Sequence, residues 1–149
     1  MQTIIRTNSD NQDFKNLILK LDELLQITDG AEHSFFAQFN KVENIKNVVV
    51  CYENEKAIGC GAFKVTDNQT VEIKRMFVDP NFRSKGVASL VLKELELWAK
   101  EENYSIIILE TGRKLENAIS LYKKSGYLIT KNYEQYIGVE SSVCFMKDI

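Results

Sequence analysis

The spacing of apolar side chains predicts a strand followed by a helix at the start of the chain. Residues 2–7 alternate weakly between apolar and polar side chains, as strands do. Residues 11–26 carry apolar side chains at helical spacing, after Asp10 or Asn11 as a candidate N-cap. The apolar positions of this helix are Phe14, Leu17, Ile18, Leu21, Leu24 and Leu25. A second, short helix is expected at residues 34–42.

Three strands in series are expected next. Residues 47–67 form two β-rich runs around a polar turn at residues 53–56, which is a hairpin signal. Residues 69–79 give a third strand, which ends before Pro80 because proline cannot continue a strand's hydrogen bonding.

The clearest helix of the sequence is expected at residues 85–101, where one apolar stripe recurs at helical spacing. The stripe consists of Val87, Leu90, Val91, Leu95 and Trp98. A continuously apolar strand follows at residues 104–111, of the type that is buried on both faces.

The C-terminal part is expected to hold a helix and two strands. Residues 117–126 form the helix, with Gly126 as its C-terminal stop. Residues 127–136 and 141–148 look like two closing strands joined by a loop. This order of elements predicts an α+β fold, a mixed sheet with helices packed on it, in a single domain over residues 1–149.

Composition narrows the class of protein. With 44% hydrophobic and 27% charged residues, the chain is expected to fold rather than to be disordered. A net charge of −2 gives no basic footprint for nucleic acid. No apolar run approaches the roughly 20 residues of a membrane span, and the N-terminus shows no secretory signal. A cytoplasmic protein is expected.

The cysteines and the histidine do not suggest a metal site. Cys51, Cys60 and Cys144 are odd in number and lack metal-ligand spacing, so buried free thiols in a reducing compartment are expected. The single histidine, His33, has no cysteine or histidine near it, and no chemical role is expected of it.

The loop before the central helix carries the features of a phosphate site. A helix start has about four unpaired N–H groups and roughly half a positive charge. Gly86 has no Cβ, so the backbone there can approach a ligand, while Arg83 and Lys85 add formal charge. The alternative is a polar helix entry with both cations solvated. The spacing is neither that of a P-loop nor that of a dinucleotide fold.

The residues of this loop resemble a known family signature. Arg83-Ser84-Lys85-Gly86-Val87-Ala88 looks like the Arg/Gln-x-x-Gly-x-Gly/Ala motif of the GNAT superfamily of acetyl-CoA-dependent N-acetyltransferases. Residues 71–80 are similar to that family's fourth strand, and residues 117–127 resemble its second motif. Ser84 and Ala88 stand where many members have glycine, which puts only the fine geometry of the loop in doubt.

The resemblance implies the fold in more detail. It implies a three-layer α/β/α arrangement around a mixed, mostly antiparallel, twisted sheet of about six to seven strands. The fourth and fifth of these strands would splay apart to admit the pantetheine arm of acetyl-CoA, which is the expected co-substrate. No metal is called for. A homodimer also stays open, since many family members pair.

The resemblance also implies which residues contact the cofactor. The loop would bind the pyrophosphate, and the backbone of Phe77 and Val78 would pair with the pantetheine arm. The implied cofactor-binding residues are Phe77, Val78, Arg83, Ser84, Lys85, Gly86, Val87, Ala88 and Asn117. For Asn117 the alternative is a helix N-cap. Lys123 and Lys124 either reach the 3′-phosphate or are solvated helix-end lysines.

Three residues match positions that carry chemistry in the family. Glu72 corresponds to a general base that often acts through water, or else lies on a solvated strand face. Glu110 is the other carboxylate near the expected cleft and would serve as base or bind the substrate ammonium. Tyr122 matches the tyrosine that protonates the coenzyme A sulfur, or else is a core residue. Tyr133 and Tyr136 would lie on the acceptor side.

The implied function is transfer of the acetyl group of acetyl-CoA to a primary amine of a small molecule or peptide by direct attack. The three cysteines have no visible base partner, so a covalent enzyme intermediate has little support. Two alternatives stay open: an acyl-CoA-binding regulator without turnover, and a small phosphate-ligand module with accidental motif similarity.

Overall fold

The computed structural model describes residues 1–32 and 44–149, and within them it shows a seven-stranded sheet with helices on both faces. The strands are β1 (Gln2–Thr7), β2 (Asn47–Glu53), β3 (Lys56–Val65), β4 (Thr70–Val78), β5 (Ile106–Gly112), β6 (Leu128–Thr130) and β7 (Ser142–Asp148). The helices are α1 (Gln12–Asp29), α3 (Val87–Glu101) and α4 (Glu116–Lys124), with short 3₁₀ turns η1 (Gly30–Glu32), η2 (Pro80–Phe82) and η3 (Glu134–Tyr136). The short helix predicted at residues 34–42 and His33 lie outside the described residues.

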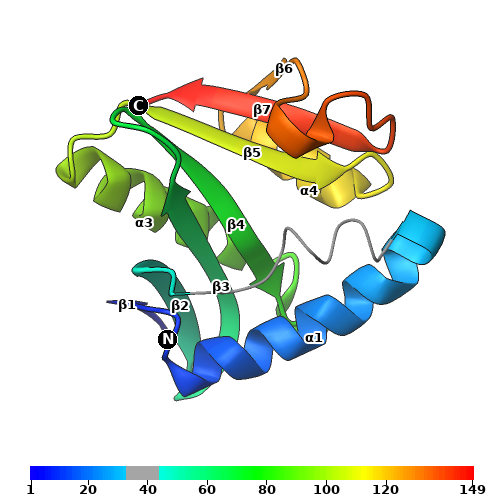
Figure 1. Ribbon diagram of the computed structural model, residues 1–149. Coiled ribbons are helices and arrows are strands. Elements are labelled where there is room, and N and C mark those ends of the chain that lie inside the picture. Colours follow the sequence, from blue (N-terminus) through cyan, green and yellow to red (C-terminus); the bar gives the residue numbers. More distant parts are fainter. Residues whose placement is uncertain (33–43) are drawn as a thin grey trace.

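The sheet is mixed and mostly antiparallel, in the order β1-β2-β3-β4-β5-β7-β6. Its one parallel pair within the described part joins β4 to β5 over Thr70–Ile73 and Ile106–Leu109. Beyond Ile73 the two strands continue without pairing and diverge, as Figure 1 shows. The predicted splay of the fourth and fifth strands is confirmed.

Helices cover both faces of the sheet, which gives three layers (Figure 1). The amphipathic face of α1 packs on one side of β2, β3 and β4, through Phe14, Leu17, Ile18 and Leu21. α3 and α4 pack on the opposite side, in one continuous apolar cluster. The N-cap of α1 is Asn11, whose side-chain oxygen accepts the Phe14 N–H at 2.9 Å. The three-layer prediction is confirmed.

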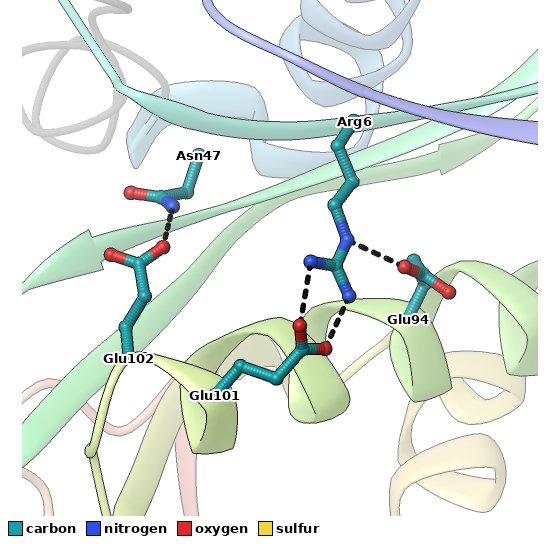
Figure 2. A network of polar contacts seen from close by, with 5 residues as sticks. All are labelled: Arg6, Asn47, Glu94, Glu101 and Glu102. Atoms are coloured by element: carbon teal, nitrogen blue, oxygen red, sulfur yellow. Dashed lines mark hydrogen bonds and ion pairs between the residues drawn. The ribbon is translucent and has the colours of Figure 1, made fainter.

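The first strand is fastened to α3 by charge (Figure 2). Arg6 donates to Glu94 at 2.6 Å and to Glu101 at 2.7 Å, and its guanidinium lies 5.1 Å from the centre of the Trp98 ring. The Asn47 amide of β2 donates to Glu102 at 2.8 Å just beyond the helix. Because these partners span the last two turns of α3 and its C-cap, the network fixes how α3 lies across β1 and β2.

All three cysteines, Cys51, Cys60 and Cys144, are buried with free thiols, as predicted. Across residues 1–32 and 44–149, no helix is long and apolar enough to cross a membrane.

The C-terminal segment departs from the prediction. Residues 127–136 were expected to form one strand, but only Leu128–Thr130 do so, and residues 134–136 form a 3₁₀ turn. The cause is Asn132, whose side-chain amide binds backbone carbonyls further along and folds the segment into a loop. The short β6 is a sheet edge, and its Leu128 and Ile129 side chains are 73% and 59% exposed.

The strand β5 also differs from its expected burial. It was predicted to be buried on both faces, whereas its residues alternate between buried and half-buried. One face packs against the apolar cluster under α3 and α4, while the other is only partly covered.

A β-bulge distorts β4 where it leaves β5. Cys60 pairs with Phe77 and Ala62 with Lys74, so the single residue Gly61 faces two residues of β4, Arg75 and Met76. Arg75 takes a left-handed backbone conformation with φ of 60°. A Cβ on Gly61 would come within 2.5 Å of Met76 Sδ and 2.9 Å of side chains on α3, so the bulge and α3 both close on this glycine.

Replacing Gly61 by alanine should therefore destabilise the protein by about 1–3 kcal/mol, because an extra methyl group must displace packed side chains. Urea unfolding of Gly61→Ala measures the change. Gly112→Ala is a matched control, since a Cβ there would meet Leu115 at an ordinary 3.5 Å. Equal stability of Gly61→Ala and the wild type would contradict the close packing of the bulge.

Candidate active site

A cavity of about 170 Å³ opens where β4 and β5 have parted. Its walls come from both strands, from α1 and α4, and from the segment between β6 and β7. The residues of interest that line it are Glu72, Glu110, Tyr122 and Tyr136, together with the cations Lys74 and Arg75. Residues from five separate parts of the sequence thus meet in one place.

Glu72 is buried in this cavity and does not lie on a solvated strand face, so that alternative is wrong. Its Oε2 accepts a hydrogen bond from the Tyr133 hydroxyl at 2.8 Å. Its Oε1 lies 3.8 Å from the Lys74 ammonium. The carboxylate is therefore held between a neutral donor and a cation.

Glu110 lies on the same face of the sheet as Glu72. Glu72 is opposite Ile108 in the parallel ladder, and Glu110 is two residues further along β5, so the alternation of side chains turns both carboxylates to one side. Glu110 Oε2 accepts a hydrogen bond from the buried Ser142 hydroxyl at 2.7 Å. The two carboxylates line one cavity, and each accepts a hydrogen bond from a side-chain hydroxyl.

Tyr122 is both a core residue and a cavity residue. Its ring is 5% exposed and packs at 5.8 Å against each of the Tyr127 and Phe145 rings. Burial raises the pKa of the Tyr122 hydroxyl, and the negative charge of Glu110 raises it further. The hydroxyl therefore stays protonated through neutral pH, which is the form of a proton donor.

The loop before α3 is held by hydrogen bonds at its start and is exposed to solvent at its end. The Asp79 carboxylate accepts the Asn81 N–H at 3.0 Å and the Lys20 ammonium at 3.2 Å. From Arg83 to Gly86 the residues are exposed, and Ser84 and Gly86 have φ of 63° and 79°. A left-handed φ suits glycine best, so Ser84 adopts a conformation that glycine would take at a lower cost.

Gly86 is the N-cap of α3 and has no side-chain oxygen to offer the first turn. Val87, the first residue of the helix, is buried against β3, where a Cβ on Gly59 would lie 2.7 Å from Val87 Cγ1. The helix start is therefore fixed on the sheet while its first N–H groups lie in an exposed loop.

The last backbone carbonyl of β4 points toward the side from which β5 has diverged. The Asp79 N–H donates to Ile58 on β3 at 2.8 Å. In a trans peptide the preceding carbonyl points the opposite way, so the Val78 oxygen points away from β3, toward the side on which β5 has diverged. Arg83 Nε donates to this oxygen at 3.1 Å. Arg83 thus links the loop before α3, which is the candidate phosphate site, to the open edge of β4.

The remaining predicted positions lie on α4. Asn117 is exposed in the first turn, and the N-cap is Leu115, so the N-cap alternative for Asn117 is wrong. Lys123 and Lys124 are exposed in the last turn. Within the described ranges, no group of three or more His, Cys, Asp or Glu residues could hold a metal ion.

Sequence reasoning missed the hydroxyls that hold the two carboxylates. Tyr133 was expected near the acceptor side but not as a partner of Glu72, because its segment was taken for a strand. Ser142 was not considered. The signal for it is the register of β5 and β7, in which Glu110 is opposite Cys144 and Ser142 is two residues away on the same face.

Comparison with known proteins identifies acetyltransferases as relatives of this chain. A sequence model described as "Acetyltransferase (GNAT) family" matches residues 14–127, more than half of the chain. "Probable N-acetyltransferase 14" of Xenopus tropicalis is 37% identical over 102 residues, which cover 68% of this chain and 49% of that protein. The chain thus spans about half the length of this curated relative.

Solved structures have the same fold. A Klebsiella pneumoniae protein named as an acyl-CoA N-acyltransferase superposes with a TM-score of 0.83 at 26% identity, covering 99% of this chain and 97% of its own. A GNAT acetyltransferase from Elizabethkingia anophelis, solved with acetyl-CoA bound, has a TM-score of 0.69 at 21% identity and covers 99% and 98%. With its parted β4 and β5 and its family match over both predicted motifs, the chain belongs to the GNAT family of acetyltransferases.

Proposed function

We propose that the protein transfers the acetyl group of acetyl-CoA to a primary amine of a small molecule or peptide. The observation that carries the proposal is the cavity at the parting of β4 and β5, in which Glu72, Glu110 and Tyr122 meet. The names of the relatives and the acetyl-CoA bound to the Elizabethkingia anophelis protein support it.

The proposed donor site combines the exposed loop with the open strand edge. The first-turn N–H groups of α3 and the side chains of Arg83 and Lys85 suit the pyrophosphate of coenzyme A. The backbone of Phe77 and Val78 would pair with the amide groups of the pantetheine arm, as an added strand does. Asn117, exposed at the start of α4, is a further proposed contact with the cofactor.

The acceptor amine must lose a proton to become a nucleophile. An alkylamine has a pKa of about 10.4, so making it neutral near pH 7.4 costs roughly 4 kcal/mol unless a base takes the proton. Glu72 is the proposed base, acting directly or through one water molecule. Glu110, on the same side of the cavity, is proposed to bind the ammonium form before the proton leaves.

The transfer itself would run without an enzyme-bound acetyl group. The amine nitrogen attacks the thioester carbonyl carbon, its proton passes to Glu72, and the carbon–sulfur bond breaks. Tyr122 then donates its hydroxyl proton to the departing thiolate. A tyrosine hydroxyl is already protonated at neutral pH, and the burial and the Glu110 charge that raise the pKa of Tyr122 keep it in this form.

Assay of thiol release from acetyl-CoA with a panel of primary amines tests the proposed function. Thiol release that depends on the amine supports it. Coenzyme A, at about 100 times its Kd, should also stabilise the folded protein by about 2.7 kcal/mol, because it binds only the native state. Protection by coenzyme A no better than by simple nucleotides would remove the proposed donor site. Binding without turnover on any amine would favour the acyl-CoA-binding regulator instead.

Tyr122→Phe should lower kcat by about 10²-fold and leave the KM for acetyl-CoA nearly unchanged, because only the proton donor is lost. Steady-state kinetics with both substrates varied measures the two constants. Tyr52→Phe is the control, since the Tyr52 hydroxyl binds Asp13 at 2.7 Å, away from the cavity residues. Unchanged turnover in Tyr122→Phe would leave this tyrosine with a packing role alone.

A further inference from the structure

The segment between β6 and β7 is folded into a compact loop by one side chain. The Asn132 amide nitrogen donates to the carbonyl oxygens of Tyr136 and Val139 at 3.0 Å each and to that of Ser142 at 3.3 Å. Backbone hydrogen bonds from Tyr136 to Tyr133 and from Ser142 to Val139 close the loop further. Asn132 thus fixes the position of the loop's aromatic side chains.

This loop and the first residue of β7 place a hydroxyl on each of the two cavity carboxylates. Tyr133 donates to Glu72 Oε2 at 2.8 Å, and Ser142 donates to Glu110 Oε2 at 2.7 Å. The Tyr133 ring packs edge-on against Tyr136, with 5.6 Å between ring centres, and Tyr136 is 2% exposed. The tyrosine that reaches Glu72 is therefore itself held in place by a buried neighbour.

We propose that Tyr133 is a positioning residue for the reaction: it holds Oε2 of Glu72, so that Oε1, which lies 3.8 Å from the Lys74 ammonium and beyond hydrogen-bond distance of it, accepts the proton of the attacking amine. The inference rests on the proposed function, in which Glu72 is the base. A carboxylate that can rotate freely presents its oxygens in many directions, whereas one fixed oxygen leaves the other in a defined place.

The Tyr133 hydroxyl is kept in the form that donates to Glu72. The other groups near this carboxylate are Lys74 on β4, Tyr136 on the loop and the Cys144 thiol on β7. Burial raises the pKa of the Tyr133 hydroxyl, and Glu72 raises it further, so the hydroxyl remains a donor.

Loss of the Tyr133 hydroxyl should therefore let the Glu72 carboxylate rotate away from its defined place. In Tyr133→Phe, kcat should fall about tenfold while the KM for acetyl-CoA stays nearly unchanged, because the base is misplaced but the donor site is intact. Steady-state kinetics with both substrates varied measures the two constants.

The matched control is Tyr127→Phe. The Tyr127 hydroxyl also donates to a glutamate, Glu96, at the same 2.8 Å, but Glu96 is not among the residues that line the cavity. This variant removes an equivalent tyrosine–glutamate hydrogen bond, and its kcat should stay close to that of the wild type. Comparing the two variants thus separates a general loss of stability from a specific effect on Glu72.

Glu72→Gln separates the two levels of the proposal. If Glu72→Gln keeps the wild-type kcat, Glu72 is not the base and that part of the proposed function fails. If kcat collapses there but Tyr133→Phe turns over at the wild-type rate, the positioning inference alone is overturned. Circular dichroism checks that each variant is folded.

A second variant covers the case in which Tyr133→Phe does not fold. Asn132→Ser keeps Tyr133 but weakens the hydrogen bonds that hold the loop, so kcat should fall by a smaller factor than in Tyr133→Phe. A wild-type kcat in folded Asn132→Ser would overturn the inference as well.

Discussion

The structure depends on the parting of two parallel strands inside a sheet. β4 and β5 pair for four residues and then separate, which leaves backbone groups in the middle of the fold without a neighbouring strand. Unpaired backbone groups are costly unless they find another partner. Arg83 supplies one, by donating to the Val78 carbonyl. The parting of the strands also opens the cavity, which the candidate catalytic side chains Glu72, Glu110 and Tyr122 line.

The parting is prepared by the bulge in β4. The extra residue turns Arg75 into a left-handed conformation and re-aims the strand beyond it. Arg75 is buried and pairs with Asp22 of α1 at 2.7 Å, which fastens the bulge to the helix on that face. On the other face, Gly59 and Gly61 let α3 come close to β3. These contacts of Arg75, Gly59 and Gly61 therefore fix the positions of the bulge, of the start of α3 and of the cavity wall together.

Much of this arrangement could be predicted from the sequence, because it is local. Apolar periodicity gave α1 and α3 to within a few residues, and the loop from Arg83 to Ala88 identified the family. Prediction failed where a specific side-chain contact decided the outcome. Residues 127–136 look like a strand in the sequence, but the Asn132 amide binds three backbone carbonyls and folds the segment into a loop. The bond from Tyr133 to Glu72 joins residues that lie 61 positions apart, and no local pattern encodes it.

The two edges of the sheet differ in how much backbone they offer to another molecule. β1 has six residues and is overlaid by the charges that bind it to α3, while β6 has only three. A strand of three residues gives a second chain few hydrogen bonds to extend, even though Leu128 and Ile129 beside it are exposed. A short last edge therefore disfavours the joining of molecules sheet to sheet into fibres, while the rest of that segment is used for the loop at the cavity.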